Sequence, residues 1–128
     1  MTKHEYYTYT KEELLHKGAK LPVIVMEDNV AVFQSMAEEM AEEIKKNNAE
    51  GKKTVFICPV GPVGQYPYFV EMVNQEKISL KNVWFINMDE YLDDDKKWVP
   101  ETHPLSFRGF MNRTVYSKIA PELVMPEE

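Results

Sequence analysis

The chain has 128 residues, 44% of them hydrophobic and 28% charged, with a formal net charge of −6. This length suits one domain with a real core, although doubly wound α/β folds usually need more residues. No apolar run is long enough to span a bilayer, and the basic residues are scattered rather than gathered into a stripe. These features argue against a membrane protein and against a nucleic-acid partner, but they do not exclude a small anionic ligand.

The first residues of the sequence contain no apolar run like the core of a signal peptide, and the single cysteine, Cys58, cannot form an internal disulfide. A reducing, cytoplasmic location is therefore expected. Residues 1–20 are polar and aromatic, which indicates an amino-terminal arm ahead of one domain at 21–128. Within the arm, Thr10 to Glu13 has the pattern of a capping box and predicts a short helix that Gly18 could end.

Hydrophobic patterning predicts three strands. Residues 21–26 form a short run rich in β-branched side chains and predict a first strand, with Pro22 tolerable at a strand start or an edge. Residues 54–59 and 83–87 are apolar on both faces, as central parallel strands are. The sequence thus predicts three strands for a parallel sheet.

Helices are expected between these strands. Asp28 is a suitable N-cap for a helix whose apolar residues recur at helical spacing as far as Ile44. A second helix is expected from Tyr66 to Gln75, behind a glycine- and proline-rich turn at 60–65 that has the character of an anion site. Strands that alternate with helices form right-handed βαβ units, so the sequence predicts an α/β domain with a parallel sheet.

Two carboxylates, Asp89 and Glu90, follow the third predicted strand directly. In an open parallel sheet, ligands collect outside the carboxyl ends of the strands, which favours a site here. Neighbours at a strand end point in different directions, so one carboxylate is expected to face a ligand and the other to support it or to bond to backbone. Such a carboxylate could act as a general base if burial raises its pKa, and the alternative is that it caps the next turn.

Other polar side chains after this strand allow two interpretations. His103 precedes Pro104 at the entrance of the last predicted helix, where a histidine is more often a cap or a surface group than a catalyst. Ser106 and Arg108 could bind an anion or could cap and solvate the helix. Three consecutive aspartates at 93–95 cannot all reach one ion from a regular element, so a solvated loop is expected there and no metal site.

Three stretches carry a family likeness: Ile57 to Gly61, Phe85 to Tyr91, and His103 to Arg113. Together they resemble the glucosamine-6-phosphate deaminase (isomerase) family. The Asn-Met-Asp-Glu-Tyr string, with the downstream His-Pro and Ser-aromatic helix, is fairly specific for it. The related 6-phosphogluconolactonases are similar through the sheet but usually carry an arginine where this chain has Tyr91, which favours the deaminase branch.

The resemblance implies a three-layer, Rossmann-like fold of the doubly wound type. It also implies the conversion of an amino-sugar phosphate into a ketose phosphate with loss of ammonia. By analogy, Asp89 is the acid/base that moves a proton between the first two carbons of the opened sugar, with Glu90 beside it. Contacts to the substrate are expected from the turn after the second strand and from side chains beyond the third: Val60, Gly61, Pro62, Val63, Tyr91, His103 and Ser106. No cofactor and no metal are expected.

The chain departs from the family's phosphate loop, which usually reads Pro-Thr/Ser-Gly-Gly-Thr/Ser. Val60 and Val63 stand in place of the hydroxyl residues, and Pro62, which has no N–H, in place of a glycine. Losing two interactions of about 1.5 to 3 kcal/mol each would weaken phosphate binding by roughly two to four powers of ten. In the family, the ring-opening histidine and the basic residues that clamp the phosphate lie in a later half, so the fold is expected to be incomplete at its carboxyl end.

Two hypotheses of function follow. In the first, the chain is the amino-terminal half of a sugar-phosphate deaminase or isomerase that is catalytic only with the remaining half. In the second, it is a binding or assembly module whose altered loop no longer holds phosphate, and a lactone hydrolase is a third alternative. A three-stranded sheet with an exposed edge and an uncovered apolar face also predicts association, either as a homo-oligomer or with the remainder of a longer polypeptide.

Overall fold

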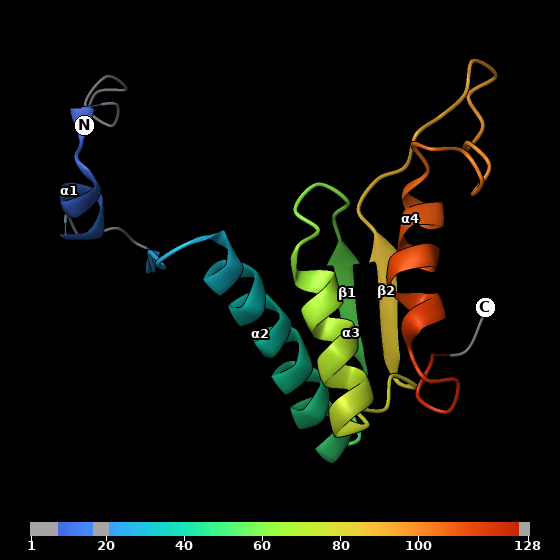
Figure 1. The fold of residues 1–128 in the computed structure, drawn as a ribbon, viewed down its shortest axis with the longest axis horizontal. Coiled ribbons are helices and arrows are strands. Elements are labelled where there is room, and N and C mark those ends of the chain that lie inside the picture. The colour runs from blue at the N-terminus through green and yellow to red at the C-terminus, as the bar shows by residue number, and fades with distance from the viewer. Residues whose placement is uncertain (1–7, 17–20, 126–128) are drawn as a thin grey trace.

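The computed structural model describes residues 8–16 and 21–125. Its elements, drawn in Figure 1, are α1 (Lys11–His16), α2 (Asn29–Ala49), β1 (Thr54–Cys58), α3 (Gln65–Glu76), β2 (Val83–Asn87), α4 (Phe107–Thr114) and a 3-10 helix (Tyr116–Lys118). Helix α1 opens with the predicted capping box, in which Glu13 N donates to Thr10 Oγ1 at 3.2 Å and Thr10 N donates to Glu13 Oε2 at 2.9 Å. Gly18, expected to end this helix, lies outside the described residues. A search of the described helices finds none with the length and apolar character of a membrane span.

The two strands form a parallel pair whose register runs from Thr54 opposite Val83 to Cys58 opposite Asn87. β-Branched and aromatic side chains fill most of both strands, and such side chains suit a pleated, half-buried surface. Helix α3 makes the crossover between them, so β1, α3 and β2 are the βαβ unit that the sequence predicts. The expected α/β fold with a parallel sheet is confirmed.

Residues 21–26 are not a strand, although the sequence predicts one there. They pair with neither β1 nor β2, and the sheet of the described residues has two strands instead of three. Leu21 and Ile24 are 75% and 79% exposed. Figure 1 shows the segment leading from the start of α2 away from the sheet, towards α1. The prediction was wrong because β propensity alone does not hold a strand, which needs a neighbouring edge to receive its backbone hydrogen bonds.

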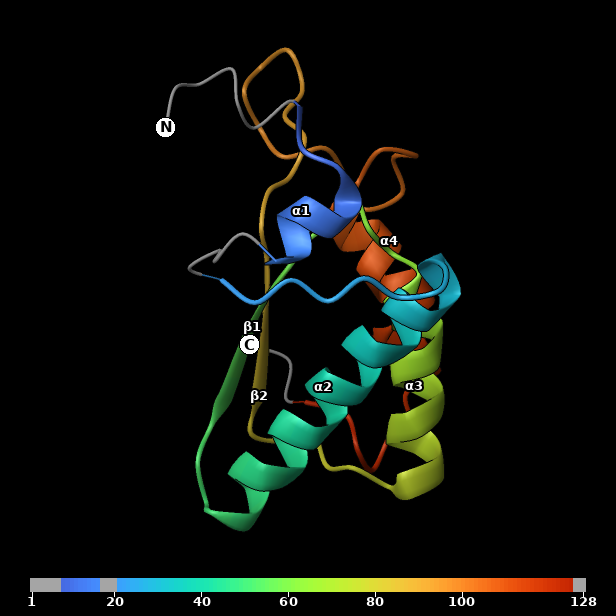
Figure 2. The same cartoon turned by 90° about the vertical axis from the view of Figure 1, so that its left-hand side faces the viewer.

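The helices of the described residues cover one face of the sheet. Figure 2 shows the two strands on one side and α2, α3 and α4 on the other. Side chains alternate along the strands, so Phe56 and Phe85 point into the helical layer, where the Phe85 ring contacts those of Phe69 and Tyr116. The opposite face is also apolar and carries four exposed side chains: Val55, Ile57, Trp84 and Ile86. The described residues therefore build two layers of the three-layer fold that the resemblance implies.

Helix α2 is held at its start by a cap and along its length by small residues. Asp28 is the N-cap, as predicted, and its Oδ1 accepts from Ala31 N at 2.8 Å. The buried residues of α2 are Ala37, Ala41 and Ile44, which lie about one turn apart on one face. The short side chains of Ala37 and Ala41 let α2 pack closely on α3, with which it shares the core.

Residues 91–99 form a small hairpin in place of the expected irregular loop. Leu92 and Trp98 make an antiparallel bridge, and Val99 N donates to Tyr91 O at 3.0 Å. Asp93, one of the three consecutive aspartates, accepts from Lys97 N through Oδ1 at 2.9 Å. Figure 1 shows this hairpin above the start of α4, at the end of the sheet where both strands finish.

Candidate functional site

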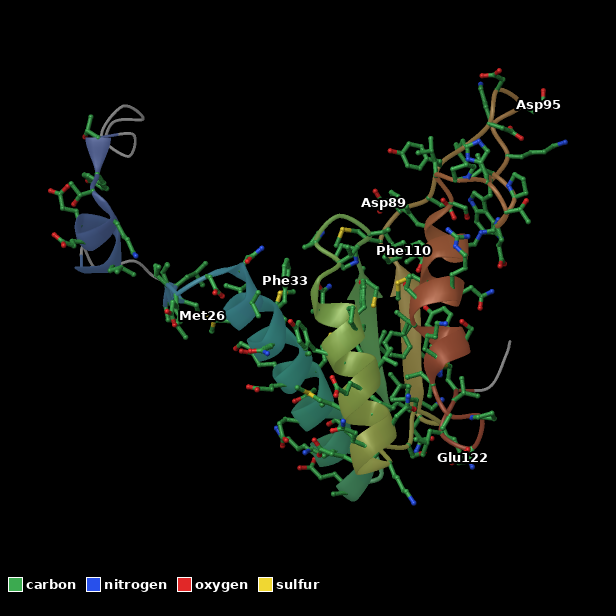
Figure 3. All side chains as sticks on the ribbon, in the orientation of Figure 1. Met26, Phe33, Asp89, Asp95, Phe110 and Glu122 are labelled. Atoms are coloured by element: carbon green, nitrogen blue, oxygen red, sulfur yellow. The ribbon has the colours of Figure 1, made fainter. Side chains whose placement is uncertain are left out.

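The carboxyl ends of β1 and β2 lie side by side at one rim of the sheet. Cys58 is opposite Asn87, and Met88 N donates to Cys58 O at 3.0 Å just beyond the last strand pair. The turn after β1 and the acidic pair after β2 therefore leave the sheet next to each other. Figure 3 shows Asp89 beside that turn. The parallel register thus brings two of the candidate residues, Val60 and Asp89, to the same rim.

A groove of about 1310 Å³ runs from this rim along the open edge of β2. It is lined by all of β2, by Asp89 and Glu90, and by later residues that include Trp98, Arg108 and Tyr116. Asp89 is exposed at the end of the groove. Its carboxylate is therefore open to a ligand that enters there.

Glu90 points instead at the start of α4, and its carboxylate receives four hydrogen bonds. Oε1 accepts from Tyr91 N and Phe107 N, both at 2.9 Å. Oε2 accepts from Arg108 N at 2.9 Å and from Ser106 Oγ at 3.1 Å. Arg108 Nε lies 3.4 Å from Oε2, and the Glu90 side chain is only 8% exposed. One carboxylate therefore ties the N-terminus of α4, where backbone N–H groups lack partners within the helix, to the end of β2.

These contacts also determine the charge of Glu90. Burial by itself raises its pKa, but the N–H groups of Arg108, Phe107 and Tyr91 and the Ser106 hydroxyl outweigh that effect and lower the pKa to about 2. The carboxylate is thus ionised and both of its oxygens are engaged. This geometry makes Glu90 an anchor for α4 and leaves Asp89 as the carboxylate that is free to meet a ligand.

We expect Glu90→Gln to lower the free energy of unfolding by about 1.5 to 3 kcal/mol at neutral pH, because a neutral amide replaces the ionised acceptor of these N–H groups. The folded-state pKa of Glu90 lies below its ordinary value of 4.5, so its stabilising effect is present above pH 4.5 and is lost as the pH falls towards about 2. Denaturant unfolding at a series of pH values should show wild type and variant furthest apart near neutrality and converging in acid.

Glu101→Gln is the matched control for this series. Its exposed carboxylate accepts from Asn112 Nδ2 at 2.9 Å, and surface contacts of this kind contribute little. The free energy of unfolding of the Glu101→Gln variant should equal that of wild type at every pH. A difference between wild type and Glu90→Gln that does not change with pH would contradict the role given to the carboxylate charge.

Ser106 and His103 make local hydrogen bonds at and just before the start of α4. Ser106 is the N-cap of the helix, is 1% exposed, and accepts from Gly109 N through Oγ at 3.1 Å. His103 accepts from Leu105 N through Nδ1 at 3.2 Å, and its own backbone N–H donates to Pro100 O at 2.8 Å. Both side chains thus have a local structural partner at the positions where the resemblance implies substrate contacts.

Arg108 and Tyr91 pack the corner between the hairpin and α4. Arg108 donates through Nη2 to Val99 O at 2.8 Å, and its guanidinium lies 5.2 Å from the centre of the Trp98 ring. The ring of Tyr91 meets that of Phe107 edge on, with centroids 5.1 Å apart. Of the two interpretations that the sequence leaves open for Arg108, its contacts favour the structural one.

The turn after β1 holds the four remaining candidates: Val60, Gly61, Pro62 and Val63. Two carbonyls of this turn are engaged internally, because Pro62 O accepts from Gln65 Nε2 at 2.8 Å and Val63 O accepts from Tyr66 N at 3.2 Å. The valines offer no hydroxyl, and the proline offers no N–H. An anion at this turn would have to be held by the backbone N–H groups of its other residues.

The sequence does not indicate that two residues, Phe33 and Gln65, shape this turn. Phe33 of α2 packs on Gly64, where an added Cβ would lie 2.3 Å from the ring. Gln65 is 2% exposed, and its Oε1 has no partner among the described atoms. In the sequence, Phe33 is one of several apolar positions of α2, and Gln65 is an ordinary polar residue at a helix start. The contact between α2 and the turn emerges only in three dimensions.

Cys58 lies directly below the turn and is 3% exposed. Burial raises the pKa of its thiol, and a hydrogen bond with Tyr66 offsets part of that rise. The thiol is therefore protonated and serves packing, as expected from its place in a buried strand. Across residues 8–16 and 21–125, no group of three or more His, Cys, Asp or Glu side chains is placed to hold a metal ion.

The known proteins that resemble this chain in sequence or in structure are named as glucosamine-6-phosphate deaminases. The chain is similar to glucosamine-6-phosphate deaminases of Phocaeicola vulgatus (35% identity over 100 residues, 76% of this chain and 36% of the relative) and Bacteroides fragilis (32% over 100 residues, 76% and 35%). It is also similar in structure to a monomeric glucosamine-6-phosphate deaminase described as a missing link of the NagB superfamily. That match has a TM-score of 0.66 at 22% identity, covers 84% of this chain and 43% of the other, and shows a shared fold. No family model matches, and the chain spans about a third of the length of its relatives.

Proposed function

Since this chain is a homologue of the glucosamine-6-phosphate deaminases over about a third of their length, we propose that it is the amino-terminal, proton-transferring part of an amino-sugar-phosphate deaminase. The reaction converts an aldose phosphate into a ketose phosphate and releases ammonia. The observation that carries the proposal is the exposed carboxylate of Asp89, at the carboxyl end of β2 and at the end of a groove.

In this proposal Asp89 is the acid/base of the isomerisation. Its carboxylate takes the proton from carbon 2 of the ring-opened amino sugar and delivers a proton to carbon 1. Water then adds at carbon 2 and the amino group leaves as ammonia, which gives the ketose. Glu90 takes no part in the proton transfer and instead fixes the chain next to Asp89, because its carboxylate is held by the start of α4.

The chain by itself is expected to be inactive. Ring opening and recognition of the phosphate need an acid/base and cations that face the ligand. His103 and Arg108 have the right chemistry, but Nδ1 of His103 is engaged by Leu105 N, and Arg108 is engaged by Val99 O and lies over Trp98. A further polypeptide segment, corresponding to the remaining two thirds of the homologues, is proposed to supply these groups.

Ammonia release from glucosamine 6-phosphate tests this proposal. The chain is assayed alone and after mixing with the carboxyl-terminal part of the Phocaeicola vulgatus relative, made separately. No release is expected from either part alone, and measurable release is expected from the mixture. If the two parts form a stable complex that releases no ammonia, Asp89 and its surroundings do not provide the proposed chemistry.

A second candidate function is a module for binding or assembly without catalysis. The turn after β1 favours it, because Val60, Pro62 and Val63 leave the turn without hydroxyls and with one N–H fewer than a glycine would offer. Trp84 lines the groove and reports on its contents through its fluorescence. Saturable quenching by glucosamine 6-phosphate in the mixed complex, together with ammonia release, would support the enzyme, and saturable quenching without ammonia release would support a binding module. A complex that shows no such change would support a module for assembly.

A further inference from the structure

We propose that Gln65 is a positioning residue for phosphate recognition, because it fixes the turn after β1 so that backbone N–H groups of the turn face the phosphate of the substrate. The proposal rests on the proposed function, which brings an amino-sugar phosphate to this rim. Gln65 is the first residue of α3 and is 2% exposed. Its burial comes entirely from this chain, so its surroundings are complete without a further segment.

The start of α3 holds three carbonyl groups of the turn from the interior side. Tyr66 donates through its hydroxyl to Pro59 O at 2.6 Å and through its backbone N–H to Val63 O at 3.2 Å. Gln65 donates through Nε2 to Pro62 O at 2.8 Å. Both donor residues are buried, so the three carbonyls point towards the interior of the protein.

This arrangement sets the direction of three N–H groups. No peptide bond of the described residues is cis, and in a planar trans peptide the C=O of one residue and the N–H of the next point in opposite directions. The N–H groups of Val60, Val63 and Gly64 therefore point out of the turn, away from α3. Within the described residues none of the three donates to an acceptor. Together with the N-terminus of α3 they are donors of the kind that hold an oxyanion.

The amide oxygen of Gln65 shows that this arrangement has a cost. Oε1 is buried without a partner among the described atoms, and a buried acceptor without a partner destabilises a fold. The carbonyl of Pro62 decides which way the amide faces, since only Nε2 can donate to it. An apolar side chain of the same length would fill this space without an unpartnered oxygen. A local arrangement that lowers stability in this way is typical of a functional position.

The departure of the turn from the family pattern makes the Gln65 amide more important. Val60, Pro62 and Val63 provide no hydroxyl, so backbone N–H groups are the donors left to the turn. Pro62 is exposed, and without the amide its carbonyl can turn to water. The N–H of Val63 belongs to the same peptide unit and would then turn inward. Gln65 thus determines whether this donor faces a ligand.

Gln65→Met tests the proposal, because methionine has nearly the length of glutamine but no amide. In the complex with the carboxyl-terminal part of the relative, the KM for glucosamine 6-phosphate should rise roughly 10-fold with kcat changed little, since one N–H to a charged group is lost. The thermal unfolding temperature of the variant should equal or exceed that of wild type, because the unpartnered oxygen is gone.

Gln75→Met is the matched control in the same helix. Gln75 is exposed near the far end of α3, where its Nε2 donates to Glu71 Oε1 at 2.9 Å. Its replacement should change neither the KM nor the unfolding temperature. A rise in KM for Gln65→Met that only follows a lowered unfolding temperature would show a purely structural role and overturn the proposal.

Amide NMR of the full chain alone tests the site without relying on activity. Inorganic phosphate or glucosamine 6-phosphate should shift the amide signals of Val60, Val63 and Gly64 saturably, and glucosamine, which has no phosphate, should not. Gln65→Met should raise the dissociation constant for these shifts roughly 10-fold.

The two measurements separate this proposal from the proposed function. Amide signals that do not move in wild type, or that move equally in Gln65→Met, overturn the role of Gln65 whatever the ammonia assay shows. If the wild-type mixture releases no ammonia but the amide shifts appear and weaken in Gln65→Met, the deaminase function is contradicted and the role of Gln65 in anion binding is supported.

Discussion

An enzyme assembled from this chain and the carboxyl-terminal part of a homologue should release ammonia roughly 10² to 10⁴ times more slowly when Asp89 is replaced by Asn. An amide cannot accept the proton from carbon 2, while its size and its hydrogen-bonding geometry stay close to those of the carboxylate. The loss should therefore appear in kcat, with KM changed little, when initial rates are measured over a range of substrate concentrations.

The exposure of Asp89 makes this experiment easy to interpret. The side chain lies open at the end of the groove, so the substitution should not disturb folding, and the thermal unfolding temperature of the variant should equal that of wild type. Asp95→Asn is the control, because Asp95 is an exposed aspartate at the tip of the hairpin in Figure 3. This variant should retain full activity. Equal rates for wild type and Asp89→Asn would remove Asp89 from the mechanism.

The largest effect on stability is expected from Gly109→Ala in α4. A Cβ at this position would lie 2.0 Å from the carbonyl oxygen of Glu101 and 2.8 Å from Nη1 of Arg113, which itself donates to that oxygen at 3.2 Å. A backbone atom cannot move aside as a flexible side chain can. The loop before α4 must therefore shift, at a cost of about 3 kcal/mol or more, which is at the upper end for overpacked sites. Denaturant unfolding measures the loss directly.

Gly61→Ala provides the comparison for this change. Nothing lies within 4 Å of a Cβ at Gly61, which is exposed in the turn after β1. Its substitution should change the free energy of unfolding by less than about 0.5 kcal/mol. If Gly109→Ala were as mild as Gly61→Ala, the close packing of α4 on residue 101 would not contribute to stability.

The features that could be predicted from the sequence are those that depend on neighbouring residues. Apolar runs of strand length gave β1 and β2, and the capping patterns at Thr10 and Asp28 gave the starts of α1 and α2. The position of Asp89 at the sheet rim followed from the parallel arrangement alone, since consecutive βαβ strands end at the same edge.

The features that could not be predicted depend on residues far apart in the chain. Residues 21–26 have the pattern of a strand, but a strand forms only where another edge is available, and the pattern does not say which edge that is. Glu90 is separated by 16 to 18 residues from the groups of α4 that it binds. Its partners can be identified only from the structure, in which the chain returns after the hairpin and brings Ser106 to Glu90. The packing of Phe33 on Gly64 is of the same kind.

The anchoring of α4 has a consequence for ligand recognition. The positive end of a helix dipole attracts anions, but at α4 that position is already filled by the chain's own Glu90. With Asp89 next to it, this side of the rim repels a phosphate group, so the amino-sugar phosphate of the proposed function is expected to enter with the end opposite its phosphate towards α4. In the proposed enzyme, capture of the phosphate and handling of the reacting carbons would thus fall to separate segments of polypeptide.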